Sequence, residues 1–77
     1  MLVALSDMAI GQSGVVRQVA GGYGFVRRLE ALGVRPGKSV VKLSAHLWAG
    51  PVLLRVDSRT IAVGLGMARR VTVEVAP

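Results

Sequence analysis

The sequence predicts a small, mainly β domain in which five short strands close into a barrel and one short α-helix covers an end. The chain has 77 residues and no cysteine, so it must fold on an apolar core without disulfides. Its hydrophobic content of 52% includes one Trp, one Tyr and one Phe, and valine, which favours strands, leads the remainder. Short apolar runs separated by turn residues indicate several strands, so we expect a single domain over residues 1–77.

One segment joins the end of a helix to the start of a strand. Phe25, Leu29 and Leu32 recur at the spacing of one helix face, which predicts the single helix. Gly33 follows this face and suits the left-handed conformation that caps helix carbonyls, and the nearby proline prevents the helix from resuming. Gly37 is then expected to open the next strand.

The remaining elements follow from alternation and turn residues. An apolar lead-in with Leu2, Leu5, Met8 and Ile10 is expected against the core. Strands are predicted at residues 15–20, 38–43, 52–56, 60–63 and 71–75, with a hairpin turn at 57–59 and a brief turn or single helical turn at 64–68. In the second strand, either Val41 or Lys42 must face outward. So few residues cannot form two packed sheets, so a bent sheet closed as an SH3-like barrel is the expected architecture.

The charge of the chain points to an anionic partner without identifying it. Ten Lys and Arg against four Asp and Glu give a net charge of +6, which would attract an acidic protein, a nucleic acid or an anionic membrane. The cations are scattered along the chain, and scattered charge usually solubilises a protein, so a solvated basic surface is the more ordinary explanation. No apolar run reaches the roughly 20 residues that cross a bilayer, and no signal-peptide pattern opens the chain. We therefore expect a soluble cytoplasmic protein.

The sequence offers no catalytic constellation. Its four acids occur singly, and its Ser and Thr residues have one imidazole, His46, as a possible base, so we expect no enzyme. His46 is also a weak candidate for binding a transition metal, which without cysteine would need carboxylates or a second copy of the chain. Glycines 21, 22 and 24 lack the lysine and the flanking unit of a phosphate-binding loop and are expected to turn the chain. We expect no cofactor and no small-molecule substrate.

Apolar and basic residues suggest where a protein partner binds. Two apolar residues lie in the expected loop 44–50, where exposure is costly without a partner, and Leu53 and Val41 are further exposed candidates. Trp and Arg are frequent anchors of protein interfaces. The predicted docking face therefore consists of Arg27, Arg28, Arg35, Leu47 and Trp48. The alternative for Trp48 is that it folds back onto the core.

A second functional interpretation comes from the segment between Gly11 and Val16, which resembles the glycine-valine turn of KOW-type modules. These are small barrels of ribosomal and transcription proteins that bind RNA, so a basic RNA-binding module is the alternative function. Single-strand binding, however, usually interleaves aromatic and basic residues. Phe25 is expected in the core, and Tyr23 and Trp48 are far apart in the sequence, so nucleic acid is the less favoured partner.

In their order along the chain, these motifs resemble the ferrous iron transport protein A family, FeoA. The matching residues cover nearly the whole chain: Leu5, Gly11, Gly14-Val15-Val16, the segment from Arg28 to Gly37, Gly50-Pro51, Ile61-Ala62-Val63, Met67-Ala68 and Val71-Thr72-Val73. The resemblance implies a small cytoplasmic SH3-like barrel that acts by protein contact with the ferrous iron transporter FeoB, a membrane protein with a cytoplasmic GTP-binding domain. It implies no catalysis and no firmly established metal ligands, and it leaves a homo-oligomer open.

The chain departs from the family pattern at four places. The family usually has an apolar residue near Lys42, a proline near His46, an arginine near Gly64 and often an acid near Met67. The same barrel also occurs as a C-terminal domain of iron-dependent DtxR-type repressors, behind DNA-binding helices. Because this chain begins at Met1 without such helices, we expect the free-standing form.

Overall fold

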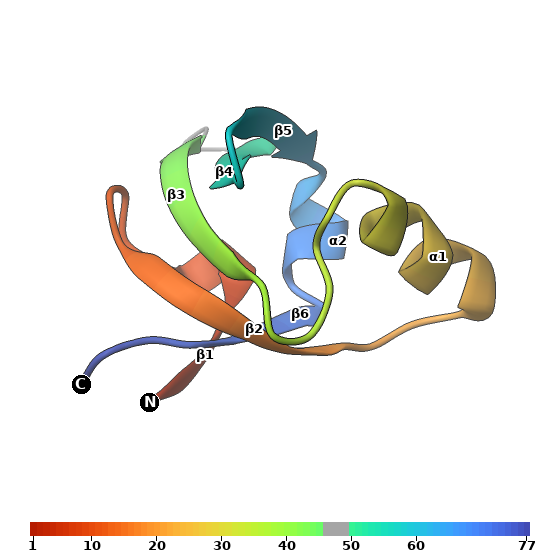
Figure 1. Cartoon of the computed structure of the whole chain (residues 1–77), viewed down its shortest axis with the longest axis horizontal. Helices are drawn as coiled ribbons and strands as arrows, with labels where there is room; N and C mark the ends of the chain where they lie inside the picture. The colour runs from red at the N-terminus through yellow and green to blue at the C-terminus, as the bar shows by residue number, and fades with distance from the viewer. Residues whose placement is uncertain (46–49) are drawn as a thin grey trace.

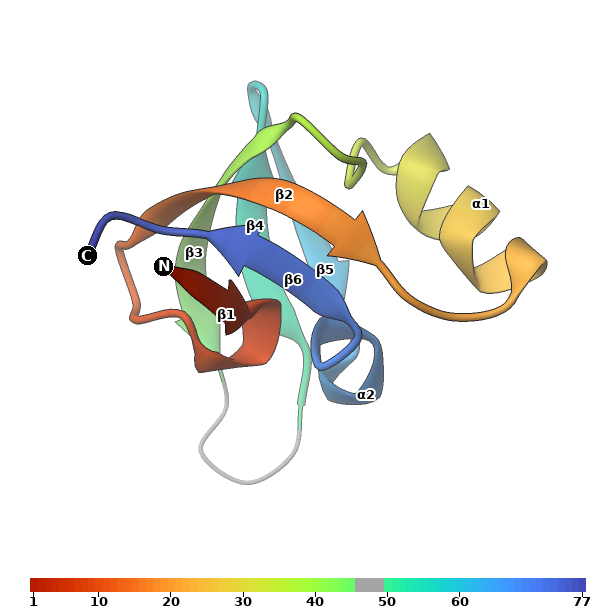
Figure 2. The same cartoon turned by 90° about the horizontal axis from the view of Figure 1, so that it is seen from below.

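A computed structural model describes residues 1–45 and 50–77, which form a six-stranded antiparallel sheet with two helices beside it (Figure 1). The elements are β1 (Leu2–Ala4), the 3-10 helix η1 (Leu5–Asp7), β2 (Ser13–Val19), α1 (Tyr23–Ala31), β3 (Ser39–Ala45), β4 (Val52–Val56), β5 (Arg59–Val63), α2 (Leu65–Ala68) and β6 (Val71–Glu74). The strands lie in the order β1-β6-β2-β3-β4-β5. Both helices lie on the side of the molecule away from the two chain ends (Figures 1 and 2).

The sheet is strongly bent because its two longest strands, β2 and β3, each carry an irregularity. The register shifts between Val16 and Gln18 where β2 pairs with β6, and between Lys42 and Ser44 where β3 pairs with β4. Such irregularities bend a strand and increase its twist, so the sheet curls around the core. The predicted mainly β architecture with a short helix is confirmed. Among the described residues, no pairing joins the edge strands β1 and β5, so closure into a barrel is not found there.

The core inside the bend is built mainly from valine. Among the described residues, fourteen hydrophobic side chains from nearly every element are buried, and the larger of them are Leu5, Met8, Leu29 and Leu54. The other ten are nine valines and Ala68, and most of these valines lie on the inward faces of the strands. β-branched side chains pack well on a pleated surface, which explains why so small a core forms without large aromatic residues.

The helix end and the following turn have the structure that the sequence predicts. The amide of Gly33 donates to the carbonyl of Glu30 at 2.9 Å, and the amide of Val34 donates to that of Leu29 at 2.9 Å. These are the two hydrogen bonds of a Schellman motif, and Gly33 has the positive φ of +96° that the motif requires. Gly37, with φ +93°, donates to the carbonyl of Val16 at 2.8 Å and so joins the turn to β2.

The fold differs from the prediction at the lead-in, at residues 65–68 and at several strand ends; β2, predicted at 15–20, runs from Ser13 to Val19. The lead-in contains a sixth strand, β1, and of its four apolar residues Leu5 and Met8 are buried whereas Leu2 and Ile10 are exposed. Residues 65–68 form a short second helix, the helical alternative of the two that were expected. The second strand begins one residue later and ends two residues later than predicted, at Ala45. A three-residue strand is too short for alternation to show in the sequence.

Lys42 is the residue of the ambiguous second strand that faces inward. Its side chain is 5% exposed, and its ammonium donates to the carbonyl of Met8 at 2.7 Å and to that of Ser6 at 2.9 Å. Val41 faces outward and is half-buried. Leu53 is also half-buried. Lys42 therefore fastens the loop before β2 to the sheet, because a buried ammonium must find hydrogen-bond acceptors.

Candidate partner-binding surface

The predicted docking residues that the structure describes are all arginines with exposed side chains. Arg27 and Arg28 belong to the last half of α1, and Arg35 lies in the turn that follows the helix. Burial of Leu29 against the core turns the side of α1 with Arg27 and Arg28 outward. The other two docking residues, Leu47 and Trp48, lie outside the described residues, as does the candidate metal ligand His46.

Arg27 is held in place by an aromatic ring. Its guanidinium lies 5.5 Å from the centre of the Tyr23 ring, and its Nη1 donates to the Tyr23 hydroxyl at 2.8 Å. The two residues are one helical turn apart, which brings their side chains together on the surface. Tyr23 is 75% exposed, so the arginine is oriented without being removed from water. A guanidinium stacked in this way keeps other N–H donors for an external acceptor.

A second arginine–aromatic pair joins the two helices. The guanidinium of Arg70, in the turn after α2, lies 5.6 Å from the centre of the Phe25 ring in α1. The amide of Ala20 also donates to the Arg70 carbonyl at 2.9 Å. Arg70 thus adds a cation beside α1, and its sequence neighbour Arg69 ends α2, although both lie more than 40 residues after Arg28. Their adjacency was the one sequence signal that could have placed them among the candidates.

Arg59 belongs to the same region but has a structural partner. From the start of β5, its Nη2 donates to the carbonyl of Leu32 at the end of α1, at 3.1 Å. A cation at the C-terminus of a helix is favoured by the exposed carbonyls and by the helix dipole. Arg59 therefore fixes the position of the helix against the sheet.

The charges of the molecule are distributed unequally between helices and sheet. Five arginines lie on α1 and on the turns after α1 and α2, and the guanidinium of a sixth, Arg59 of β5, contacts the end of α1. The set is Arg27, Arg28, Arg35, Arg59, Arg69 and Arg70. We call this set the helical surface. Against these six stands one acid, Glu30, a balance of +5, whereas the rest of the chain has four cations and three acids, a balance of +1. Most of the net charge of +6 therefore lies around the helices.

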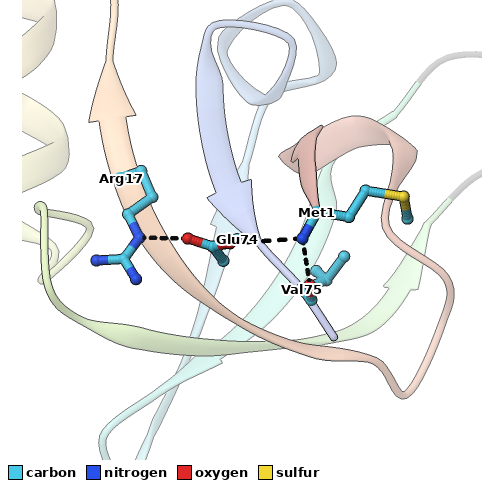
Figure 3. Close-up of polar contacts among 4 residues, drawn as sticks. All are labelled: Met1, Arg17, Glu74 and Val75. Atoms are coloured by element: carbon cyan, nitrogen blue, oxygen red, sulfur yellow. Dashed lines mark hydrogen bonds and ion pairs between the residues drawn. The ribbon is translucent and has the colours of Figure 1, made fainter. Parts of the chain in front are cut away.

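On the sheet side the acids pair with cations. Glu74 of β6 accepts a hydrogen bond from Arg17 Nε at 3.0 Å and lies 3.4 Å from the Met1 amine, which also donates to the Val75 carbonyl (Figure 3). Arg17 first, and the Met1 amine second, hold the pKa of Glu74 below its ordinary value of 4.5. Lys38 Nζ donates to both carboxylate oxygens of Asp57, at 2.9 and 3.0 Å. These pairs neutralise two of the four cations outside the helical surface, Arg17 and Lys38.

The chemistry available to this arrangement is binding by charge and hydrogen bonds. Among residues 1–45 and 50–77, no three His, Cys, Asp or Glu side chains gather as metal ligands would. In the same part of the chain, no helix has both the length and the apolar character needed to span a membrane. Among the described residues, none of the six arginines of the helical surface forms an ion pair.

Comparisons with known proteins point to one family. A family model described as the FeoA domain matches residues 3–75. The crystal structure of an iron uptake regulatory protein (FeoA) is 34% identical with a TM-score of 0.92, covering 99% of this chain and 100% of that one. The FeoA protein of Chlorobium tepidum is 23% identical with a TM-score of 0.87, over 97% of this chain and 71% of that one.

The same fold occurs inside larger regulators. A manganese-dependent transcriptional repressor is 20% identical with a TM-score of 0.89, over 97% of this chain but only 42% of the repressor. At this identity the likeness concerns the fold alone. Among curated proteins, none matches the chain.

Proposed function

Because the chain belongs to the FeoA family of iron uptake proteins, we propose that it is a cytoplasmic accessory protein of ferrous iron transport that acts by contact with the cytoplasmic region of the transporter FeoB. The FeoA domain is not an enzyme, so its contribution must be made by binding. The observation that supports a contact through the helices is the balance of +5 on the helical surface.

Each part of the helical surface would have a different task in such a contact. The long-range field of the six arginines would steer an acidic partner toward the helices. Arg27, oriented by Tyr23, and Arg70, oriented by Phe25, would then donate to carboxylates with less loss of side-chain freedom than free arginines. Arg28 would add charge without such preorganisation.

The experiment is a calorimetric titration of this chain with the isolated cytoplasmic region of the transporter. We expect binding that weakens as salt is raised, because charges on the two surfaces attract across water. The double variant Arg27→Gln/Arg28→Gln should bind about five- to thirtyfold more weakly, the effect of losing two exposed charge pairs. The predicted anchor Trp48 is tested with Trp48→Ala, for which the loss of an anchor residue predicts roughly thirtyfold weaker binding.

Arg17→Gln is the matched control for each single arginine change, since it removes the same charge from the sheet side. Arg28→Gln should weaken binding by about two- to fivefold, and Arg17→Gln should not. Affinity that is unchanged in the double variant would overturn the docking surface. The absence of any binding to the transporter would overturn the function itself.

The arginine–aromatic pairs favour RNA binding as the second candidate. Tyr23 exposes its ring, and Arg27 and Arg70 lie over neighbouring rings, an arrangement on which unpaired bases also stack. A titration with single-stranded RNA separates the two candidates. Binding above the weak non-specific level, falling steeply with the logarithm of salt, would support the RNA module. No detectable binding at physiological salt would exclude it.

A further inference from the structure

A pocket opens on the sheet side of the molecule, outside the helical surface. It has a volume of about 560 Å³ and lies where the starts of β2 and β3 meet the end of β4. The side chains that line it include two serines, Ser13 and Ser39, the apolar Val41, and the charged Lys38, Arg55 and Asp57. It therefore combines hydroxyls, an apolar side chain and charges in one hollow, which is more polar than most small-ligand sites and suits a charged ligand.

Strand register places the lining residues next to one another. Ser13 of β2 lies opposite Val41 of β3, and Val41 lies opposite Arg55 of β4, so the three form one row across the sheet. Ser39 is two residues before Val41 and so shares its face. Because the neighbouring residue Val40 is fully buried, this shared face is the outer one. The donors of the pocket are thus fixed on three paired strands rather than on a mobile loop.

Arg55 faces the pocket with a charge that no described residue neutralises. Asp57 is two positions further along the chain and would be its natural partner, but both oxygens of Asp57 accept hydrogen bonds from Lys38. Among the described residues, no ion pair or side-chain hydrogen bond involves Arg55, and none involves the hydroxyls of Ser13 or Ser39. Lys38 is therefore assigned as a positioning residue, since its two hydrogen bonds draw Asp57 toward itself and compete with a contact between Asp57 and Arg55.

We propose that this pocket binds a carboxylate group through Arg55. The planar guanidinium matches a carboxylate with two parallel hydrogen bonds, and the serine hydroxyls can donate to the same oxygens. The half-buried Val41 would contact an apolar substituent next to the carboxylate. The charges of Lys38, Arg55 and Asp57 sum to +1, which matches the single charge of a carboxylate better than the double charge of a phosphate. The carboxylate belongs either to a small free acid or to the end of a peptide, and the experiment distinguishes them.

The first experiment follows backbone amide resonances of the whole chain by NMR during titration with sodium butyrate. A second titration uses a glycine pentapeptide extended by a C-terminal valine, with a free or an amidated end. Binding should shift the amides of Ser39, Val41 and Arg55 with butyrate and with the free peptide, but not with the amide. Tighter binding of the peptide than of butyrate would assign the site to peptide ends, and equal binding would assign it to small acids. Absence of shifts at these three amides with both carboxylates would overturn the proposal.

The second experiment tests the roles of the two cations. Arg55→Gln should weaken butyrate binding about tenfold or more, the effect of losing a charge-assisted hydrogen bond, whereas Arg17→Gln, with the same charge loss elsewhere, should leave it unchanged. Equal affinity of Arg55→Gln and wild type, or an equal loss with Arg17→Gln, would overturn the site.

Variants of Lys38 distinguish its positioning role from a general effect of positive charge on carboxylate binding. Lys38→Gln should weaken binding, because the released Asp57 can then pair with Arg55. The double variant Lys38→Gln/Asp57→Asn should restore the affinity, although it still lacks the lysine. Asparagine tolerates the positive φ of +57° at position 57, so the turn is preserved. Failure of the second change to restore binding would contradict the role given to Lys38. This outcome is independent of whether the helical surface binds the transporter.

Discussion

At the scale of single residues, the buried ammonium of Lys42 has the largest predicted effect on stability. It satisfies the carbonyls of Ser6 and Met8, of which the Met8 bond is fully buried. Lys42→Met keeps most of the apolar stem but removes the donors, so the free energy of unfolding should fall by about 1–3 kcal/mol, the cost of an unsatisfied buried acceptor. Lys42→Ala should lose more, because the packing of the stem is lost as well.

Urea unfolding of both variants measures this difference. If Lys42→Met is as stable as the wild type, the cost of burying the ammonium equals what its hydrogen bonds contribute, and the role given to Lys42 is wrong. The sequence could not place this residue inside, since the adjacent Val40 and Val41 remove the alternation that would define the inward face. The structure resolves the ambiguity through the carbonyls of the lead-in, which are contributed by a segment more than 30 residues away.

Glu74 makes the stability of the folded chain depend on pH in the acid range. Its pKa in the folded state is lowered from 4.5, first by Arg17 and then by the Met1 amine, so folding favours the ionised form. The stability that these contacts contribute is therefore fully present when the pH is above the pKa of Glu74 in the unfolded chain. It is lost as the pH falls through the lower pKa of Glu74 in the folded chain. Below pH 4.5 the wild type should lose stability more steeply than Glu74→Gln, as measured by urea unfolding at several pH values. Parallel curves for the two proteins would contradict this.

At the scale of elements, the end of α1 depends on Gly33. A Cβ atom there would lie 3.1 Å from Val56 Cγ1 and 3.3 Å from Arg59 Nη2, in addition to the strain of a φ of +96°. Gly37 has a similar φ of +93°, but a Cβ would meet no atom within 4 Å. Gly37→Ala should therefore cost about 1–2 kcal/mol of stability from strain alone, and Gly33→Ala should cost more. Thermal unfolding measures both variants. If Gly33→Ala lowers the stability less than Gly37→Ala does, the contacts of the added Cβ with Val56 and Arg59 do not affect stability.

The elements were predicted well where local sequence determines them and less well where distant segments do. The helix face of Phe25, Leu29 and Leu32 and the left-handed Gly33 are local features, and the structure confirms them. The partnership of Arg70 with Phe25 depends on a contact between α2 and α1, which no periodicity in the sequence reveals. The predicted docking face of Arg27, Arg28, Arg35, Leu47 and Trp48 stays a prediction, and the proposed contact adds Arg70 to it.

At the scale of the whole molecule, the separation of charge makes a prediction that needs no knowledge of the partner. A cation-exchange surface should contact the chain mainly through the helices, where the balance is +5, rather than through the sheet, where it is +1.

Two double variants test this, Arg27→Gln/Arg28→Gln on the helical surface and Arg17→Gln/Arg55→Gln on the sheet side. Each lowers the net charge of the chain by two, but the first should elute from the exchanger at lower salt than the second. Both pairs are exposed, so neither change should disturb the fold. Equal elution would mean that the field of the molecule is effectively uniform, in which case the helical surface could not orient an acidic partner. A lower salt for the first variant would show that the fold itself gives the molecule a binding side, because Arg59 and Arg70 reach α1 only through contacts between segments far apart in the sequence.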